Sequence, residues 1–273
     1  MGLIRVALGA VGGAISDQYK EYFICDALPD NVLVRRASRN TDGKTRNNGS
    51  ENIISNGSLI VVNPGQAMAI VDQGRIVEFT ADPGPFVYDS SAEPSIFEGK
   101  LGKNIIESFK TIGRRIAFGG NTGRDQRVYY FNLLEIKNNL YGTPTPVMFR
   151  AVDRNIGLDM DVDLRCNGTY TYFLEDPILF FEKFSGNIKG DYTREDMNEM
   201  LRNSFVMALQ PALGKIAELE IRPNQISSHV VELRDAMREF LKPDWTPRGI
   251  RLGEITMNPV SYTHLRAHET GRN

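Results

Sequence analysis

Histidine, the side chain that most often takes part in acid–base and nucleophilic catalysis, is scarce in this sequence. The 273 residues contain three histidines, and only His229 lies in the predicted folded body. His264 and His268 fall in a C-terminal segment that is excluded below. A single histidine at the start of a predicted helix is typical of a surface or capping residue. We therefore expect no catalytic residues, and we predict that the chain is not an enzyme.

Cysteine and glycine patterns also give no sign of a metal or phosphate site. Cys25 and Cys166 lie far apart, and neither belongs to a CxxC pair, so we expect no zinc ribbon and no disulfide framework. Reduced, unpaired cysteines are typical of the cytoplasm. Gly102 and Lys103 resemble part of a phosphate loop, but the pattern fails because Phe97 stands where its first glycine is required.

Three aspartates, Asp159, Asp161 and Asp163, alternate with apolar residues along one segment. Alternate residues of a strand point to the same face, whereas a calcium loop needs a turn glycine and a distal glutamate. The pattern therefore predicts a solvated strand face. No metal ligand and no cofactor is predicted.

Bulk composition limits the partners of the chain. It has 32 basic and 34 acidic residues and 41% hydrophobic residues. A balanced charge gives no overall attraction to nucleic acid, and we expect no nucleic-acid partner. The apolar fraction is sufficient for a full hydrophobic core.

The first 25 residues carry apolar side chains at a spacing near 3.6, which predicts an amphipathic helix, although three glycines weaken it. Its apolar run is too short to cross a bilayer. Such a helix could lie in the membrane interface or pack on the folded body. The candidate membrane-binding residues are Leu3, Ile4, Ala7, Leu8, Val11 and Ile15.

A second candidate lipid contact is the basic cluster around a predicted helix from Lys103 to Arg114. Basic side chains close to a membrane surface attract anionic headgroups. The alternative is an ordinary solvated helix face. The candidate headgroup-binding residues are Lys103, Lys110, Arg114 and Arg115.

The remaining pattern predicts an α+β fold, in which a mostly antiparallel sheet is covered by helices. Residues 26–58 are predicted to be a polar loop region, and 59–258 the folded domain. A hairpin is expected from residues 67–72 and 75–80. A second is expected from 158–166 and 169–174, with Asn167-Gly168 as its turn.

Two long helices and a strand complete the predicted domain. The first helix is expected to start at Thr193, with Met200, Leu201 and Phe205 on its apolar stripe. The second is expected to run from Ser228 until Pro243 stops it. A closing strand is expected over residues 250–257. Residues 259–273 resemble the translation of a sequencing adapter, and we exclude them from fold reasoning.

Several short motifs resemble the SPFH (band 7) domains of stomatin, prohibitin, flotillin and HflK/C proteins. They are Val62–Gln66 followed by the turn Asp82–Phe86, then Val152-Asp153, and then Asp176-Pro177. Where the family has Asp-Gly, this chain reads Asp153-Arg154. The segments DALPDNVLVRR, NIISNGS, YGTPTPVMFR, NIGLD and ALQPALGKI resemble a bacterial "virion core protein-like" subfamily, encoded near phage-shock-protein-A homologues.

This resemblance implies a non-catalytic, membrane-associated scaffold that forms homo-oligomers and takes part in bacterial membrane organisation or the envelope-stress response. It implies a cytoplasmic protein, peripheral on the inner face of the cell membrane, with a phage-shock-protein-A-like protein as a possible partner. Two alternatives stay open: a soluble ligand- or peptide-binding module, and an enzyme whose site combines scattered carboxylates and lysines.

Overall fold

A computed structural model describes residues 2–6, 21–38, 53–91, 103–113, 125–153 and 157–262. The chain divides into two compact units, each assembled from three separate segments. Unit 1 comprises Met1–Glu135, Phe173–Asp196 and Pro247–Ile250. Unit 2 comprises Ile136–Tyr172, Met197–Thr246 and Arg251–Asn273.

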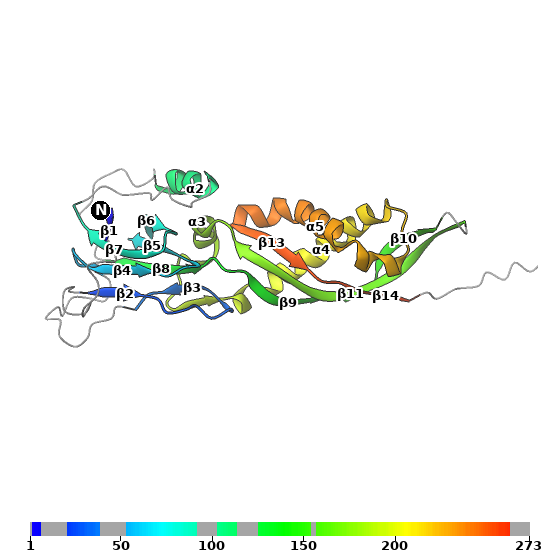
Figure 1. Ribbon diagram of the computed structural model, residues 1–273, viewed down its shortest axis with the longest axis horizontal. Helices are drawn as coiled ribbons and strands as arrows, with labels where there is room; N and C mark the ends of the chain where they lie inside the picture. The colour runs from blue at the N-terminus through cyan, green and yellow to red at the C-terminus, as the bar shows by residue number, and fades with distance from the viewer. Residues whose placement is uncertain are drawn as a thin grey trace, which may run out of the picture. The chain divides into compact units, whose positions relative to one another are not determined.

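Unit 1 contains two sheets (Figure 1). Buried side chains from both sheets belong to one hydrophobic cluster. The four-stranded sheet has the order β1 (Gly2–Arg5), β7 (Gly84–Asp89), β4 (Leu59–Val62), β2 (Tyr22–Ile24). The five-stranded sheet has the order β12 (Asp191–Thr193), β3 (Val32–Arg36), β8 (Gln126–Asn132), β5 (Gln66–Asp72), β6 (Arg75–Thr80). All neighbouring pairs are antiparallel except β2 and β4.

Side chains from both sheets of unit 1 meet in the core. Phe23 and Phe86 come from the four-stranded sheet, and Met68 and Tyr130 from the five-stranded sheet. The helical segments of this unit include α2 (Lys103–Gly113), α3 (Pro177–Phe180), the π-helical turn η3 (Phe181–Ser185) and the 3-10 turn η4 (Arg194–Asp196). The ring of Phe181 lies 4.9 Å from that of Tyr129, so the helical segment also packs on β8.

The prediction of an N-terminal helix is wrong for those of its residues that the structure describes. Leu3 and Ile4 lie in β1, and Tyr22 lies in β2. β1 pairs with β7, with Leu3 opposite Tyr88, so hydrogen bonds to another strand replace those of a helix. A short apolar run fits either period, and distant pairing decides between them. Residues 7–20 lie outside the described part of the chain.

The predicted loop region of residues 26–58 is also partly wrong, because it contains β3. Val32, Leu33 and Val34 of this strand are buried, and β3 lies between β12 and β8. The hairpin of β5 and β6 is confirmed, with Gln73 and Gly74 both at positive φ in its two-residue turn.

Unit 2 is built around one long strand, β11 (Leu158–Leu174) (Figure 1). β9 and β10 pair along one edge of β11, whereas β13 and β14 pair along the other. Asn167 of β11 is paired on both edges of the strand: it lies opposite Gly142 of β9 on one edge and opposite Asn258 of β14 on the other. The partner strands are β9 (Ile136–Gly142), β10 (Val147–Asp153), β13 (Ile250–Ile255) and β14 (Asn258–Tyr262).

Helices cover one face of this sheet. They are α4 (Asn198–Ala217), the 3-10 turn η5 (Pro223–Ser228) and α5 (Val230–Trp245), after which η6 (Thr246–Arg248) follows. Phe205 of α4 stacks on Tyr170, with ring centroids 4.6 Å apart. The indole of Trp245 donates a hydrogen bond to Ser204 Oγ at 2.8 Å, which joins α5 to α4.

The predicted turn at Asn167-Gly168 is wrong, because both residues lie inside β11. Gly168 is required for a different reason: a Cβ atom there would overlap the backbone carbonyl of Thr256. Glycine in a strand can indicate a close approach of another backbone as well as a turn.

The other strand and helix predictions hold with shifted boundaries. The α+β class is confirmed, and Val162, Leu164 and Cys166 are buried while the intervening side chains are exposed. α4 begins at Asn198, after η4, rather than at Thr193. α5 continues through Pro243 to Trp245, because proline in the last turn removes only one helical donor. β14 includes residues 259–262, which the sequence analysis excluded.

We expect Gly168→Ala to lower the free energy of unfolding of unit 2 by about 3 kcal/mol, because the added methyl group must displace the Thr256 carbonyl. The only tryptophan, Trp245, lies in this unit and reports its unfolding by fluorescence in denaturant. Gly214→Ala is the matched control, since no atom lies near its Cβ position and alanine favours a helix by up to about 1 kcal/mol. Equal effects of the two changes would contradict this packing argument.

Candidate functional site

The predicted membrane-binding residues near the N-terminus do not share one environment. Leu3 is 4% exposed and belongs to the core of unit 1, whereas Ile4 on the same strand is 51% exposed. A core side chain cannot also contact lipid, so Leu3 is not available for membrane contact in this fold. Ala7, Leu8, Val11 and Ile15 lie outside the described residues.

The predicted headgroup cluster lies on and beyond α2. Lys103 begins this helix, and the side chain of Lys110 is exposed. Arg114 and Arg115 follow the helix and lie outside the described residues. Ile105 and Ile106 of α2 are half-buried, and the helix packs against α3 and β6 (Figure 1).

A hydrogen bond joins α2 to the start of α3. The Ser108 hydroxyl donates to Asp176 Oδ2 at 2.6 Å. Asp176 Oδ1 accepts from the backbone N–H groups of Ile178 and Leu179, both at 3.1 Å, and so caps α3. The backbone N–H of Asp176 donates to the carbonyl of Gly249 at 3.1 Å. Aspartate followed by proline is typical of a helix N-cap, but no local signal indicates Ser108, which is 68 residues away.

Burial raises the pKa of Asp176, whereas the hydrogen bond from Ser108 and the two backbone donors oppose that rise. The residue is only 4% exposed. The donors therefore stabilise a carboxylate that is otherwise poorly solvated.

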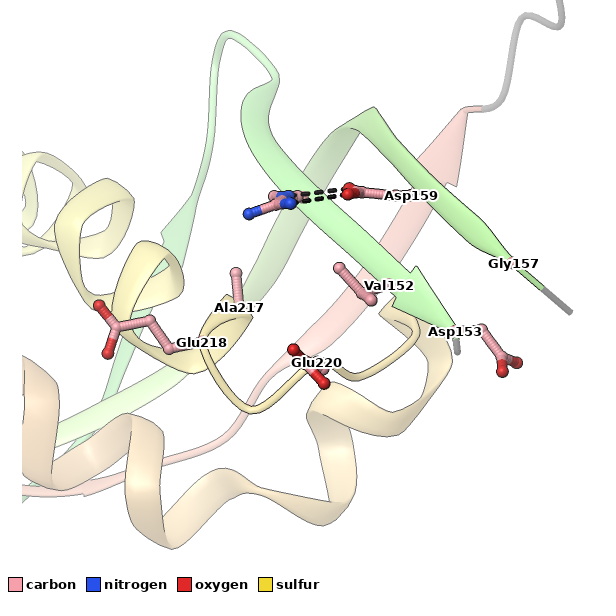
Figure 2. A pocket seen from close by; sticks show the side chains of 8 residues that line it. Val152, Asp153, Gly157, Asp159, Ala217, Glu218 and Glu220 are labelled. Carbon is pink, nitrogen blue, oxygen red and sulfur yellow. Dashed lines mark hydrogen bonds and ion pairs between the residues drawn. The ribbon is translucent and has the colours of Figure 1, made fainter. Parts of the chain in front are cut away.

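Unit 2 contains an open depression of about 580 Å³ beside the edge strand β10 and the end of α4 (Figure 2). Arg150 donates two hydrogen bonds to Asp159, at 2.8 and 2.6 Å. The labelled carboxylates point in different directions rather than toward one centre. The lining residues are Arg150, Val152, Asp153, Gly157, Asp159, Ala217, Glu218 and Glu220.

One of these lining residues forms a partly buried ion pair. The side chain of Asp153 is 7% exposed and accepts hydrogen bonds from Nε and Nη2 of Arg222. This pair joins the end of β10 to the segment after α4. In the sequence, Asp153 stands out only as part of the SPFH-like motif, and Arg222 carries no local signal.

These arrangements do not assemble a catalytic or metal centre within the described residues. No group of three or more His, Cys, Asp or Glu side chains there could hold a metal ion. His229 stands before α5, and its Nδ1 lies 3.3 Å from Glu232 Oε1. Asp159, Asp161 and Asp163 are exposed on β11, as the alternation predicted.

Large apolar side chains are exposed on the helices of unit 2. Met207 of α4 is 78% exposed, the highest value among the large hydrophobic residues that the structure describes. Val231 and Phe240 of α5 are also exposed. None of the helices described is long and apolar enough to cross a membrane.

Comparison with known proteins adds a family match. Residues 45–265 match the family described as SPFH domain-Band 7. The uncharacterized protein YdjI of Bacillus subtilis (strain 168) is 26% identical over 144 residues, which are 53% of this chain and 38% of that relative. The chain therefore matches less than half of the relative's length.

We expect Asp153→Ala to destabilise unit 2 by about 1–3 kcal/mol, because a largely buried acceptor of two hydrogen bonds is lost. Trp245 fluorescence in a urea titration measures the change. The control is Asp159→Ala, whose ion pair with Arg150 is solvent-exposed and should contribute little. A larger loss in the Asp159 variant would contradict the assignment.

Asp176→Asn should change the pH dependence of unfolding, because asparagine keeps a cap but carries no charge. A raised folded-state pKa means that folded Asp176 binds its proton more tightly than unfolded Asp176 does. The stability of the wild type relative to the variant should therefore fall as pH rises from about 4 through the raised pKa, and stay constant above it.

Urea unfolding followed by circular dichroism at a series of pH values tests this prediction. Asp159→Asn is an opposite control, since Arg150 lowers the pKa of Asp159. In that comparison, the stability of the wild type relative to Asp159→Asn should decrease as pH falls through the folded-state pKa of Asp159. Slopes of the same sign in both comparisons would contradict the account.

Proposed function

Because the chain belongs to the SPFH domain-Band 7 family, we propose that it is a membrane-associated, oligomeric scaffold. Its proposed place is the inner face of the bacterial cell membrane, where it is peripheral. Its proposed role is membrane organisation or the envelope-stress response, with a phage-shock-protein-A-like protein as a partner.

The observation that carries this proposal is the extent of the family match. Residues 45–265 include most of unit 1 and nearly all of unit 2, so the match concerns the domain as a whole. Proteins of this family are generally membrane-associated, scaffold-like and non-enzymatic.

Surface chemistry supports both parts of the proposal. Lys110 is exposed on α2, and Lys103 begins the same helix, so this helix offers positive charge to anionic lipid. Exposed Met207, Val231 and Phe240 on the helices of unit 2 provide apolar area for contact between copies. Our candidate self-contact surfaces are therefore α4, which contains Met200 and Met207, and the following helix α5.

The alternative of a soluble ligand-binding module requires a deep apolar cleft. The depression beside β10 differs from that expectation, because it is open and four of its eight lining residues are carboxylates. An enzyme built from scattered carboxylates and lysines requires convergent side chains, and the labelled carboxylates diverge (Figure 2). The scaffold proposal is therefore the better supported one.

The double variant Lys103→Glu, Lys110→Glu should reduce co-sedimentation with anionic vesicles several-fold, because each reversal replaces attraction by repulsion. Point variants are preferable to removal of residues 1–24, which would delete both β1 and β2. The measurement compares vesicles of phosphatidylglycerol and phosphatidylcholine with vesicles of phosphatidylcholine alone.

Lys183→Glu, Lys189→Glu is the matched control, since it makes the same charge change at two exposed lysines of unit 1 that do not belong to α2. We expect this control to retain most of the binding. Equal losses in the two double variants would show a general charge effect and contradict a specific role for α2.

A further inference from the structure

The α2 side chains whose burial is described are half-buried or exposed. Ile105, Ile106 and Ser108 are half-buried, and Glu107, Lys110 and Thr111 are exposed. None of the α2 side chains whose burial is described is fully buried. In unit 2, by contrast, α4 buries seven residues in its core. The position of α2 should therefore be sensitive to the loss of a single strong interaction.

The strongest polar interaction described for α2 is the hydrogen bond from Ser108 to Asp176. Its acceptor is a buried carboxylate, and its length is 2.6 Å. Hydrogen bonds to charged groups stabilise more than those between neutral groups. Asp176 itself is held in place from two sides, by the cap of α3 and by the backbone of Gly249.

The sequence of α2 is that of a basic amphipathic helix, which can bind a lipid surface when it is detached from unit 1. The segment KNIIESFKTIG has two lysines, one acid and four large apolar residues in eleven positions. A basic amphipathic helix lies in the interface with its apolar side in the acyl boundary and its lysines at the headgroups.

We propose that the Ser108–Asp176 hydrogen bond is a latch that holds α2 on unit 1 and keeps Ile105 and Ile106 from an anionic membrane. When the latch opens, α2 leaves α3 and β6, and Ile105 and Ile106 enter the lipid interface. This inference rests on the proposed function, because it names the element that binds the membrane. Ile105 and Ile106 contact unit 1 when α2 is held there and contact lipid when α2 is released, so the two states exclude each other. Lipid therefore shifts the equilibrium toward the released state.

Ser108→Ala in the full chain tests the latch, because it removes the hydroxyl donor and leaves the cap of α3 intact. Thr111→Ala is the matched control: it removes a hydroxyl from an exposed position of the same helix. Ser108→Thr keeps a hydroxyl and should behave as the wild type. The first readout, without lipid, is amide hydrogen exchange in residues 103–113. The second is co-sedimentation with phosphatidylglycerol vesicles.

For Ser108→Ala we expect exchange in α2 to be roughly tenfold faster or more, as for the loss of a hydrogen bond to a charged group. Half-maximal vesicle binding should occur at a several-fold lower lipid concentration, with no gain on phosphatidylcholine vesicles. The Thr111→Ala and Ser108→Thr proteins should match the wild type in both measurements.

Two results would overturn the inference, and they are distinguishable from failure of the proposed function. Equal exchange in the Ser108→Ala and Thr111→Ala proteins would show that no latch exists, even if the wild type binds vesicles and the proposed function stands. Faster exchange without any vesicle binding, by variant or wild type, would show that α2 is released but does not meet lipid. That second result would count against the membrane-associated function as well.

Discussion

The buried carboxylate of Asp176 is a constraint on which much of unit 1 depends, because a buried charge must be surrounded by hydrogen-bond donors. Its donors come from two elements, the first turn of α3 and the Ser108 hydroxyl of α2. The backbone of Gly249, far along the sequence, fixes the same residue. One side chain therefore positions the helical segment that packs on β8 and also the basic helix at the surface. In unit 2, the contact of Gly168 with Thr256 has a comparable role, since only glycine permits that approach.

Sequence patterns predicted the elements whose conformation is determined by residues close together in the chain. The hairpin of β5 and β6, the alternation along β11, the cap at Asp176 and the range of α2 were all readable from spacing and turn chemistry. The errors arose where distant pairing decides the conformation. Residues 2–5 become a strand because β7 is available to pair with them, and Asn167-Gly168 stays extended because strands lie on both of its sides. A one-dimensional pattern does not show such partners.

Some features of the candidate sites likewise follow from local sequence patterns, whereas others depend on residues that are distant in the sequence. The exposure of Lys110 on α2 and of the aspartates on β11 follows from helix and strand periodicity. The pairs Ser108–Asp176 and Arg222–Asp153 join residues 68 and 69 positions apart, and no motif indicates them. Family membership indicates a function class that these geometries alone do not. The structure shows the Ser108–Asp176 hydrogen bond that joins α2, the helix that we propose as the membrane contact, to the start of α3.

The proposed function requires that this chain form an oligomer on a membrane surface. Mass photometry of the full chain at micromolar concentration, in solution and on a supported bilayer containing phosphatidylglycerol, tests it most directly. A membrane-bound scaffold should give particles of several copies that accumulate on the anionic bilayer and not on a neutral one. Particles of a single 30.6 kDa chain that stay in solution above both bilayers would contradict it.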